Sequence, residues 1–316
     1  MIRILTNDGI DETGKKMLLD AGFDVITDKV EQASLGEFLD QNQVQVLTVR
    51  SATKVDSTVL HSGKHLKLVA RGGVGIDNID SETAGKLGIP VINTPASSSD
   101  SVAELVIAGM FSMCRFLYDS NRQMPSKGDT DFNDLKKKYA GGTELKNKTL
   151  GIVGLGRIGK SVASRALGLG MKVLAYDPSV SIANISIHIH GAGKLMVPIQ
   201  TSSLDEVISN CDYLTLHVPG GQVVGENEIN KMKKGVCIIN TSRGGVVNEK
   251  ALIEGLNSGK IAHAFLDVFT NEPKPDKALL QHAKISLTPH IGAATKEAQE
   301  RIGIELAEKI IDHFKN

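Results

Sequence analysis

Short apolar runs rich in β-branched residues alternate with longer segments of helical periodicity along nearly the whole chain. Such alternation predicts βαβ units and parallel sheets. In the first part of the chain, the predicted strands are Ile2–Leu5, Asp24–Ile26, Val46–Val49, Leu66–Ala70 and Val91–Asn93. In the second part, they are Leu150–Val153, Lys172–Ala175, Tyr213–His217, Val236–Asn240, Ala264–Asp267 and Ile285–Leu287. Because this many strands would strain a single open sheet, we expect two sheets.

Two further segments have a helical pattern of their own. Apolar residues recur at helical spacing from Val102 to about Ser120, and Thr295–Phe314 carries the apolar stripe of an amphipathic helix. The polar stretch Asn121–Lys148 is interpreted either as a solvated arm or as a contact with a second subunit. The pattern as a whole predicts an α/β protein of two doubly wound parallel-sheet domains, Rossmann-like and flavodoxin-like.

The amino-acid composition narrows the possible classes of protein. The chain has 316 residues, which agrees with two domains at roughly 150 residues each. Lysine plus arginine and aspartate plus glutamate both number 36, so the basic excess typical of nucleic-acid binding is absent. The three cysteines, Cys114, Cys211 and Cys237, have neither disulfide-framework nor metal-ligand spacing. We interpret His188-Ile-His190 as part of a surface strand, and we expect no metal site.

The N-terminal residues carry charge where a signal peptide needs an apolar core, and the apolar run Leu105–Cys114 is too short to span a bilayer. We therefore expect a cytoplasmic protein without a membrane partner.

A glycine-rich loop, Gly154-Leu-Gly-Arg-Ile-Gly159, follows the strand Leu150–Val153 and opens a helix. In a dinucleotide site, Gly154 would permit the tight turn, Gly156 would let the backbone approach a pyrophosphate, and Gly159 would let helix and strand pack closely. Asp177 ends the next strand, where a carboxylate accepts hydrogen bonds from the adenosine ribose and repels a 2′-phosphate. The sequence therefore predicts NAD rather than NADP.

Polar residues follow other predicted strands as well. In the second part these are His217, Thr241-Ser242-Arg243 and Asp267, and in the first part Arg50-Ser51 and Arg71-Gly72-Gly73. Ligands of open parallel sheets bind beyond the carboxyl ends of the strands. We expect the two edges to form a cleft, with the cofactor on one wall and the substrate on the other.

Five blocks of the sequence resemble the D-isomer-specific 2-hydroxyacid dehydrogenases: Arg71–Asp80, Gly154–Gly159, Thr241–Gly245, Asp267–Pro273 and Thr288–Thr295. Within that family, Val49–Val55 and Gly142–Gly151 look most like the D-3-phosphoglycerate dehydrogenases. The resemblance covers essentially the whole chain in order and implies a short form without a C-terminal regulatory domain. Two segments depart from the family pattern, Ser179–Ser203 by its length and irregularity and Pro219–Gly225 by its missing turn.

The resemblance implies a catalytic triad of Arg243, Glu272 and His290. A histidine can take the hydroxyl proton of a 2-hydroxy acid while hydride leaves C2. Glu272 would orient the imidazole ring, and the planar fork of Arg243 would hold the substrate carboxylate or the C2 oxygen. Taken singly, each residue also has a structural interpretation: a surface charge, a turn residue and a loop histidine.

The resemblance also implies the residues of the two binding sites. The cofactor residues share the glycine loop or a strand end of the second part: Gly154, Gly156, Arg157, Ile158, Gly159, Asp177, His217, Thr241, Ser242, Arg243, Asp267, His290 and Gly292. The substrate residues share the strand ends of the first part, where glycine N–H groups would cradle a carboxylate: Arg50, Ser51, Arg71, Gly72, Gly73 and Val74.

Together, these observations lead us to expect NAD-dependent oxidation of D-3-phosphoglycerate to 3-phosphohydroxypyruvate, the first step of serine biosynthesis. We expect residues 1–98 with 291–316 to bind the substrate and residues 99–290 to bind NAD, with dimerisation through the NAD-binding domain. One alternative is another D-2-hydroxyacid dehydrogenase, such as a glyoxylate or hydroxypyruvate reductase. Another is an NAD-sensing regulatory protein on the same scaffold.

Overall fold

The computed structural model describes residues 1–315, which form two compact units. The first unit consists of Met1–Ser99 and the segment that begins at Ala293, and the second unit is Asp100–Gly292. The second unit is therefore inserted into the chain of the first.

The first unit has a five-stranded sheet in which every neighbouring pair is parallel, in the order β2-β1-β3-β4-β5. Its strands are β1 (Arg3–Thr6), β2 (Asp24–Ile26), β3 (Val46–Val49), β4 (Leu68–Arg71) and β5 (Val91–Asn93). Its helices are α1 (Glu12–Asp20), α2 (Leu35–Gln41), α3 (Ser57–Ser62), α4 (Ser81–Lys86) and α13 (Lys296–Lys315), with a 3₁₀ turn at Gln32–Ser34. One core joins α2, α3 and α4 to the sheet, and a second joins α1 and α13 to its other face.

Two glycines bring the backbones of α1 and α13 into contact. A Cβ atom on Gly14 would lie 2.4 Å from the carbonyl oxygen of Gly303, so no side chain fits between the helices there. Leu306 and Ile310 of α13 then reach the core that contains Ile4 of β1. The C-terminal helix is therefore an integral layer of the first unit.

The second unit has a six-stranded parallel sheet in the order β13-β12-β11-β10-β6-β7. Its strands are β6 (Thr149–Val153), β7 (Lys172–Tyr176), β10 (Tyr213–Leu216), β11 (Val236–Asn240), β12 (Ile261–Leu266) and β13 (Ile285–Leu287). Its helices are α5 (Ser99–Cys114), α6 (Leu117–Lys127), α7 (Phe132–Lys138), α8 (Arg157–Gly168), α9 (Leu204–Asn210), α10 (Glu226–Lys231), α11 (Glu249–Ser258) and α12 (Lys277–Leu280).

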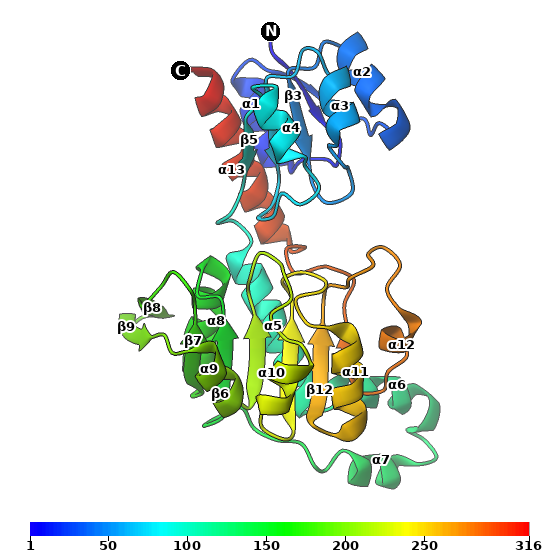
Figure 1. Ribbon diagram of the computed structural model, residues 1–316, viewed down its shortest axis with the longest axis vertical. Coiled ribbons are helices and arrows are strands. Elements are labelled where there is room, and N and C mark those ends of the chain that lie inside the picture. Colours follow the sequence, from blue (N-terminus) through cyan, green and yellow to red (C-terminus); the bar gives the residue numbers. More distant parts are fainter. Residues whose placement is uncertain (316) are drawn as a thin grey trace. The chain divides into compact units, whose positions relative to one another are not determined.

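Helices cover both faces of this sheet (Figure 1). One core contains residues of α9, α10, α11 and α12, and the other contains residues of α5 and α8. The central strands β10 and β11 are buried along their whole length, as is typical of a sheet covered on both sides. The predicted fold class is confirmed: the protein is α/β and has two doubly wound parallel sheets.

The helix predicted from Val102 to Ser120 is wrong at its C-terminal end. Helix α5 ends at Cys114, and Phe116 adopts a left-handed conformation with φ of +54° before α6 begins. The Phe116 ring packs edge-on against His263 of β12, with 5.5 Å between ring centroids. This tertiary contact ends the helix where the periodicity of the sequence continues. The polar stretch that follows is also more regular than predicted, because it contains much of α6 and all of α7.

No single helix within residues 1–315 is long and apolar enough to cross a membrane. Helices α5 and α6 reach that length and composition only together, as a pair bent by 58°.

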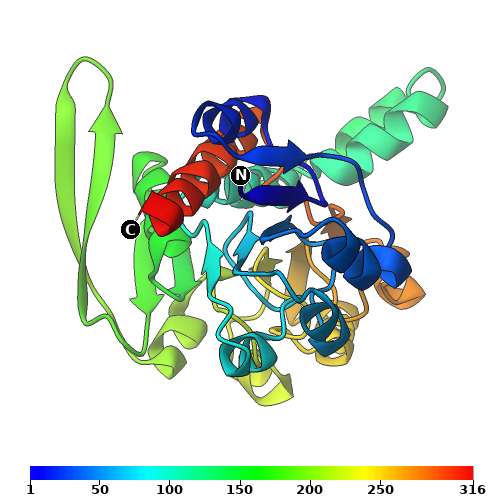
Figure 2. The same ribbon diagram turned by 90° about the horizontal axis from the view of Figure 1, so that it is seen from above.

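The segment Ser179–Ser203, interpreted from the sequence as irregular, contains an antiparallel hairpin. Its strands are β8 (Ile182–Ile189) and β9 (Gly193–Gln200), which pair along their whole length. His188 lies in β8, and His190 lies in the turn. In Figure 2 the hairpin runs beside α8, and its turn extends past that helix. The hairpin therefore adds a structured element beside α8, the helix that follows the predicted cofactor loop.

Candidate active site

The turn between β6 and α8 requires glycine at two positions. Gly154 has a φ of +93°, and a Cβ atom there would lie 2.3 Å from the carbonyl oxygen of His217. A Cβ atom on Gly159 would lie 2.1 Å from the carbonyl oxygen of Gly154. The first close approach gives the sharp turn, and the second lets α8 pack directly against the loop.

Gly156, the N-cap of α8, is in a different environment. A Cβ atom there would meet no protein atom within 4 Å, so contacts within the protein do not require glycine. Arg157 beside it is exposed, whereas Ile158 packs against the core. The N-terminus of α8, with its partial positive charge, therefore has open space at Gly156, which fits a pyrophosphate.

Three backbone N–H groups hold the carboxylate of Asp177 beside this loop. Its Oδ2 accepts a hydrogen bond from the N–H of Leu155 at 2.8 Å. Its Oδ1 accepts from the N–H groups of Ser179 and Val180 at 2.8 and 3.1 Å. Because a carboxylate oxygen accepts about two hydrogen bonds, Oδ2 keeps the capacity to accept one from a ligand hydroxyl.

Two buried polar atoms at the same edge of the sheet make no hydrogen bond within residues 1–315: Nδ1 of His217 and Oγ1 of Thr241. The other ring nitrogen of His217 lies 3.0 Å from Oγ1 of Thr215. Burial lowers the pKa of His217 to about 3, so its ring is neutral at neutral pH. Since an unpaired buried polar group costs about 1–3 kcal/mol, both atoms favour a ligand with polar groups.

The loop after β11 is fixed by Asn240, the last residue of that strand. Its Oδ1 accepts hydrogen bonds from the N–H and hydroxyl of Ser242 at 3.1 and 2.8 Å. Its Nδ2 donates to the carbonyl oxygen of Arg243 at 2.8 Å. The Arg243 side chain also donates to the carbonyl oxygen of Ser242 at 2.6 Å. A buried amide thus sets the conformation of Ser242 and of the arginine backbone.

The loop after β13 is fixed in a similar way by Asp267. One carboxylate oxygen accepts from the hydroxyl of Thr288 at 2.6 Å and from the N–H of Ile291 at 2.8 Å. The other accepts from the N–H of Gly292 at 2.9 Å, and the backbone carbonyl of Asp267 accepts from the N–H of His290 at 2.8 Å. Burial raises the pKa of the Asp267 carboxyl, and these hydrogen bonds oppose that rise.

His290 lies in this loop, and its ring contacts Glu272. Its φ of +54° lies in the left-handed region, which a residue with a side chain adopts at a cost that the surrounding hydrogen bonds must offset. Its Nδ1 lies 2.8 Å from Oε2 of Glu272, whose Oε1 accepts a hydrogen bond from the N–H of Phe269 at 2.9 Å. Glu272 therefore occupies one ring nitrogen and leaves Nε2 for another partner.

In the first unit, Arg50 and Arg71 lie at the carboxyl ends of adjacent strands. Val49 pairs with Arg71 in the β3–β4 register, and Arg50 follows directly. The N–H of Arg50 donates to Oδ2 of Asp8 at 2.7 Å, and burial lowers the pKa of its guanidinium. Ser51 is exposed. Two cationic side chains thus belong to one edge of this sheet.

The glycines after Arg71 differ from the sequence-based prediction of a carboxylate cradle. The N–H of Gly72 donates to the carbonyl of Val49 at 2.9 Å, and the N–H of Gly73 donates to that of Arg71 at 3.0 Å. A Cβ atom on Gly73 would lie 2.0 Å from a guanidinium nitrogen of Arg71, so that side chain lies over the glycine. The sheet uses the N–H group of Gly72 and a tight turn uses that of Gly73, which leaves a cradle role to Val74, the next predicted residue.

Comparison with known proteins supplies the family. Residues 107–292 match the protein family described as "D-isomer specific 2-hydroxyacid dehydrogenase, NAD binding domain". These residues contain the glycine loop, Asp177 and the Glu272–His290 pair. The chain belongs to the D-isomer-specific 2-hydroxyacid dehydrogenases. It is a NAD-dependent dehydrogenase of D-2-hydroxy acids, and the open N-terminus of α8 and the unpaired buried atoms fit that cofactor.

The relatives of this dehydrogenase are named for different substrates. A hydroxypyruvate reductase from Thermotoga maritima is 40% identical over 98% of this chain and 97% of its own length. A human D-3-phosphoglycerate dehydrogenase is 39% identical over 99% of this chain. This dehydrogenase spans only 56% of the length of that human relative. A NAD-bound 3-phosphoglycerate dehydrogenase structure from Entamoeba histolytica matches with a TM-score of 0.79 and 28% identity, covering 100% of this chain and 96% of its own.

Two residues that shape the site of the dehydrogenase were not among those predicted from the sequence. Asn240 hydrogen-bonds the loop that carries Arg243, and Thr288, in the loop that carries His290, donates to Asp267. In the sequence, Asn240 is the polar last residue of an otherwise apolar predicted strand, and Thr288 directly follows another predicted strand. Neither signal distinguishes a residue that holds a loop from one that contacts a ligand.

Proposed function

We propose that this dehydrogenase oxidises D-3-phosphoglycerate to 3-phosphohydroxypyruvate. The observation that carries the proposal is the presence of Arg50 and Arg71 at the ends of adjacent strands. One arginine suffices for a carboxylate, whereas a substrate with a second, phosphate anion favours additional cations. Similarity to phosphoglycerate dehydrogenases over almost the whole chain supports this substrate.

The proposed catalytic residues are His290, Glu272 and Arg243. NAD, when bound, accepts the hydride that leaves C2. Nε2 of His290 takes the hydroxyl proton in oxidation and returns it in reduction, while Glu272 at Nδ1 fixes the ring and stabilises its protonated form. Arg243 binds the substrate carboxylate or the C2 oxygen with its planar fork of donors. The cofactor contacts proposed for NAD are those predicted from the sequence, with Asp177 on the adenosine ribose.

Reduction of hydroxypyruvate or glyoxylate is the second candidate function. The Thermotoga maritima hydroxypyruvate reductase favours it, because that relative matches this chain over 97% of its own length. The two candidates share the chemistry at C2 and differ in the phosphate group.

Steady-state kinetics on matched substrates distinguish them. The assays measure the oxidation of D-3-phosphoglycerate and D-glycerate, and the reduction of 3-phosphohydroxypyruvate, hydroxypyruvate and glyoxylate. We expect the phosphorylated member of each pair to have the higher kcat/KM. We expect Arg50→Met and Arg71→Met each to lower kcat/KM for the phosphorylated substrate by about 10- to 100-fold, the size of a lost charge-assisted hydrogen bond.

Lys64→Met, at an exposed cation of the same unit that pairs with Asp40 at 3.0 Å, is the control and should leave both substrates unaffected. A higher kcat/KM with hydroxypyruvate or glyoxylate would assign the second function instead. If the arginine variants lost kcat/KM equally for phosphorylated and unphosphorylated substrates, these side chains would not recognise the phosphate group.

We also propose a homodimer formed through the second unit. Large apolar side chains are exposed on three consecutive helices: Phe111 of α5, Leu117 and Met124 of α6, and Phe132 of α7, with exposed fractions of 39 to 56%. Apolar surface concentrated on one set of elements is typical of an interface. The polar segment that the sequence left open between a solvated arm and a subunit contact contributes to this surface.

A further inference from the structure

We infer that Thr201, at the base of the β8–β9 hairpin, is a positioning residue for the Asp177 carboxylate and therefore for the adenosine ribose of NAD. The inference rests on the proposed contact between Asp177 and that ribose. Thr201 itself touches neither Asp177 nor the glycine loop through a hydrogen bond; it acts on the segment that does.

That segment is Ser179–Ser181. The N–H groups of Ser179 and Val180 hold Oδ1 of Asp177, so the orientation of the carboxylate depends on the backbone at these two residues. The hydroxyl of Thr201 donates to the carbonyl oxygen of Val180 at 2.7 Å and lies 3.1 Å from that of Ser181. The N–H of Thr201 donates to the carbonyl of Ser181 at 2.9 Å. The base of the hairpin, where β9 ends, thus closes the loop that holds the carboxylate.

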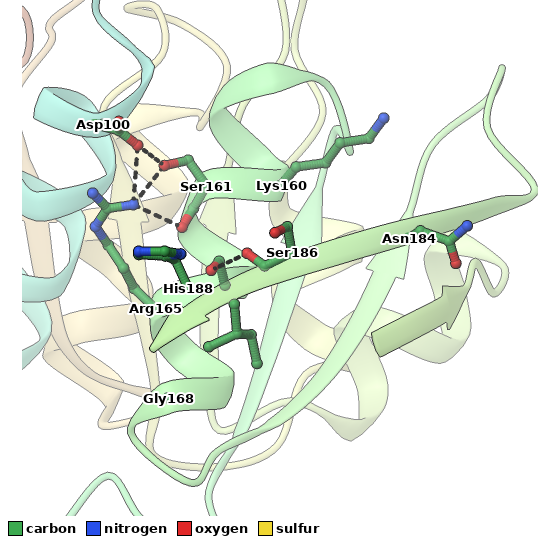
Figure 3. Close-up of a pocket in the computed structure, with 10 residues that line it drawn as sticks. Asp100, Lys160, Ser161, Arg165, Gly168, Asn184, Ser186 and His188 are labelled. Atoms are coloured by element: carbon green, nitrogen blue, oxygen red, sulfur yellow. Dashed lines mark hydrogen bonds and ion pairs between the residues drawn. The ribbon is translucent and has the colours of Figure 1, made fainter. Parts of the chain in front are cut away.

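The base of the hairpin is itself anchored to the sheet and to α8. The N–H of Ser202 donates to the carbonyl oxygen of Ala175 in β7 at 2.8 Å. Further along the hairpin, Ile185 is buried in the same core as Ala163 and Ala166 of α8. The hydroxyl of Ser164 in α8 donates to the carbonyl of Ser186, where β8 crosses the helix (Figure 3). Thr201 is therefore a fixed point against which the Asp177 loop is held.

Loss of the Thr201 hydroxyl removes one hydrogen bond to the carbonyl of Val180 and gives Ser179–Ser181 more conformational freedom. The N–H groups of Ser179 and Val180 then hold Oδ1 of Asp177 less firmly. A less ordered carboxylate binds the ribose diol more weakly and also repels a 2′-phosphate less strongly. Neither change reaches the Glu272–His290 pair, which lies after other strands of the sheet.

The test is the variant Thr201→Val, which has nearly the same shape and lacks the hydroxyl. Isothermal titration calorimetry gives the dissociation constants of NAD and of ADP-ribose, which carries the ribose but no nicotinamide. We expect both constants to rise by about threefold to tenfold, which corresponds to one neutral hydrogen bond. The value of kcat at saturating NAD should stay unchanged, and the preference for NAD over NADP in kcat/KM should fall. Thr201→Ser, which keeps the hydroxyl, should restore both constants.

Ser258→Ala is the matched control, because it removes a hydroxyl that donates to the carbonyl oxygen of Gly255 within α11, an element separate from the hairpin and the Asp177 loop. It should leave both dissociation constants unchanged. Thr201→Ala removes the same hydroxyl with a smaller side chain and replaces the valine variant if that one does not fold. Unchanged constants in the folded variants would overturn the inference.

Asp177→Asn separates this inference from the proposed function. If that variant binds ADP-ribose as the parent does, the proposed contact between Asp177 and the ribose is wrong. If it weakens binding while removal of the Thr201 hydroxyl does not, only the positioning role of Thr201 is wrong.

Discussion

At the scale of single residues, side chains proposed for catalysis are held by neighbours that occupy their other polar groups. Glu272 occupies Nδ1 of His290, and Asp267 holds the backbone on both sides of that histidine. Asn240 does the same for the loop of Arg243. Such contacts fix the geometry before a substrate arrives, so less conformational entropy is lost on the way to the transition state.

The proposed role of His290 predicts a large loss of turnover when the ring is removed. We expect His290→Ala to lower kcat by about 10²–10⁴-fold, the usual contribution of general acid–base catalysis, while the dissociation constant of NAD changes little. Stopped-flow measurement of NADH formation gives the first quantity, and calorimetry gives the second. His190→Ala, at an exposed histidine of the same unit, is the control. Turnover that survives in His290→Ala would assign the proton transfer to another group.

His217 predicts a dependence of stability on pH. Burial lowers its pKa to about 3, whereas an unfolded histidine titrates near ~6.5. Between these values the unfolded chain binds a proton that the folded protein does not, so stability falls as pH decreases from about 6.5 towards 3. The expected loss from this group is on the order of 1 kcal/mol per pH unit.

Urea unfolding at several pH values across that interval measures the effect. His217→Asn should lose less of its free energy of unfolding on acidification than the parent protein does. His190→Asn, at an exposed histidine in the hairpin turn, should follow the parent. Identical acid dependence in His217→Asn and the parent would show that the buried ring does not stay neutral.

At the scale of elements, the position of α8 depends on one missing side chain. A Cβ atom on Gly159 would lie 2.1 Å from a backbone oxygen, whereas one on Gly168, at the other end of the same helix, would meet no atom within 4 Å. We expect Gly159→Ala to destabilise the protein by about 1–3 kcal/mol through overpacking and to weaken NAD binding. Gly168→Ala should be neutral or stabilising by up to about 1 kcal/mol.

Thermal unfolding and NAD titration of both variants check this prediction. A Gly159→Ala variant as stable as Gly168→Ala would mean that the loop can move away from the helix at little cost.

The sequence predicted the parallel strands well because they are short apolar runs, and most of them are largely buried. Asp24–Ile26, Val46–Val49, Val91–Asn93, Val236–Asn240 and Ile285–Leu287 coincide with observed strands. The end of α5 could not be predicted, since the Phe116 ring packs on a strand far along the chain. The hairpin could have been predicted: Ala183, Ile185 and Ile187 alternate with polar residues, a period-two pattern obscured by the expectation of a family-like segment.

For the candidate site, the sequence indicated which strand ends carry reactive side chains, because parallel strands bring their carboxyl ends to one edge. It could not indicate how those side chains are held. The hydrogen bonds that Asn240 and Asp267 make depend on the loop conformations, and carbonyl groups of the protein itself accept from the N–H groups of Gly72 and Gly73. Such competition between a ligand and the protein's own backbone is not visible in residue types.

At the scale of the whole molecule, the proposed dimer predicts a concentration-dependent assembly state. We expect the double variant Leu117→Asp with Phe132→Asp to be monomeric under conditions where the parent protein is a dimer, because buried charges oppose an apolar interface. Analytical ultracentrifugation measures the change. Leu195→Asp, at a residue of the hairpin with a comparable exposed fraction of 53%, should leave the assembly unaltered. A parent protein that stays monomeric at high concentration would contradict the proposal.

The place of α13 in the first unit has a consequence for synthesis on the ribosome. Leu306 and Ile310 complete a core with the first strands, yet all of Asp100–Gly292 must be translated before they emerge. At about 5–20 residues per second, this delay is on the order of 10 to 40 s. During that time the face of α1 around Gly14 has no covering helix. The core of the unit that begins the chain is therefore completed only after the whole second unit has been synthesised.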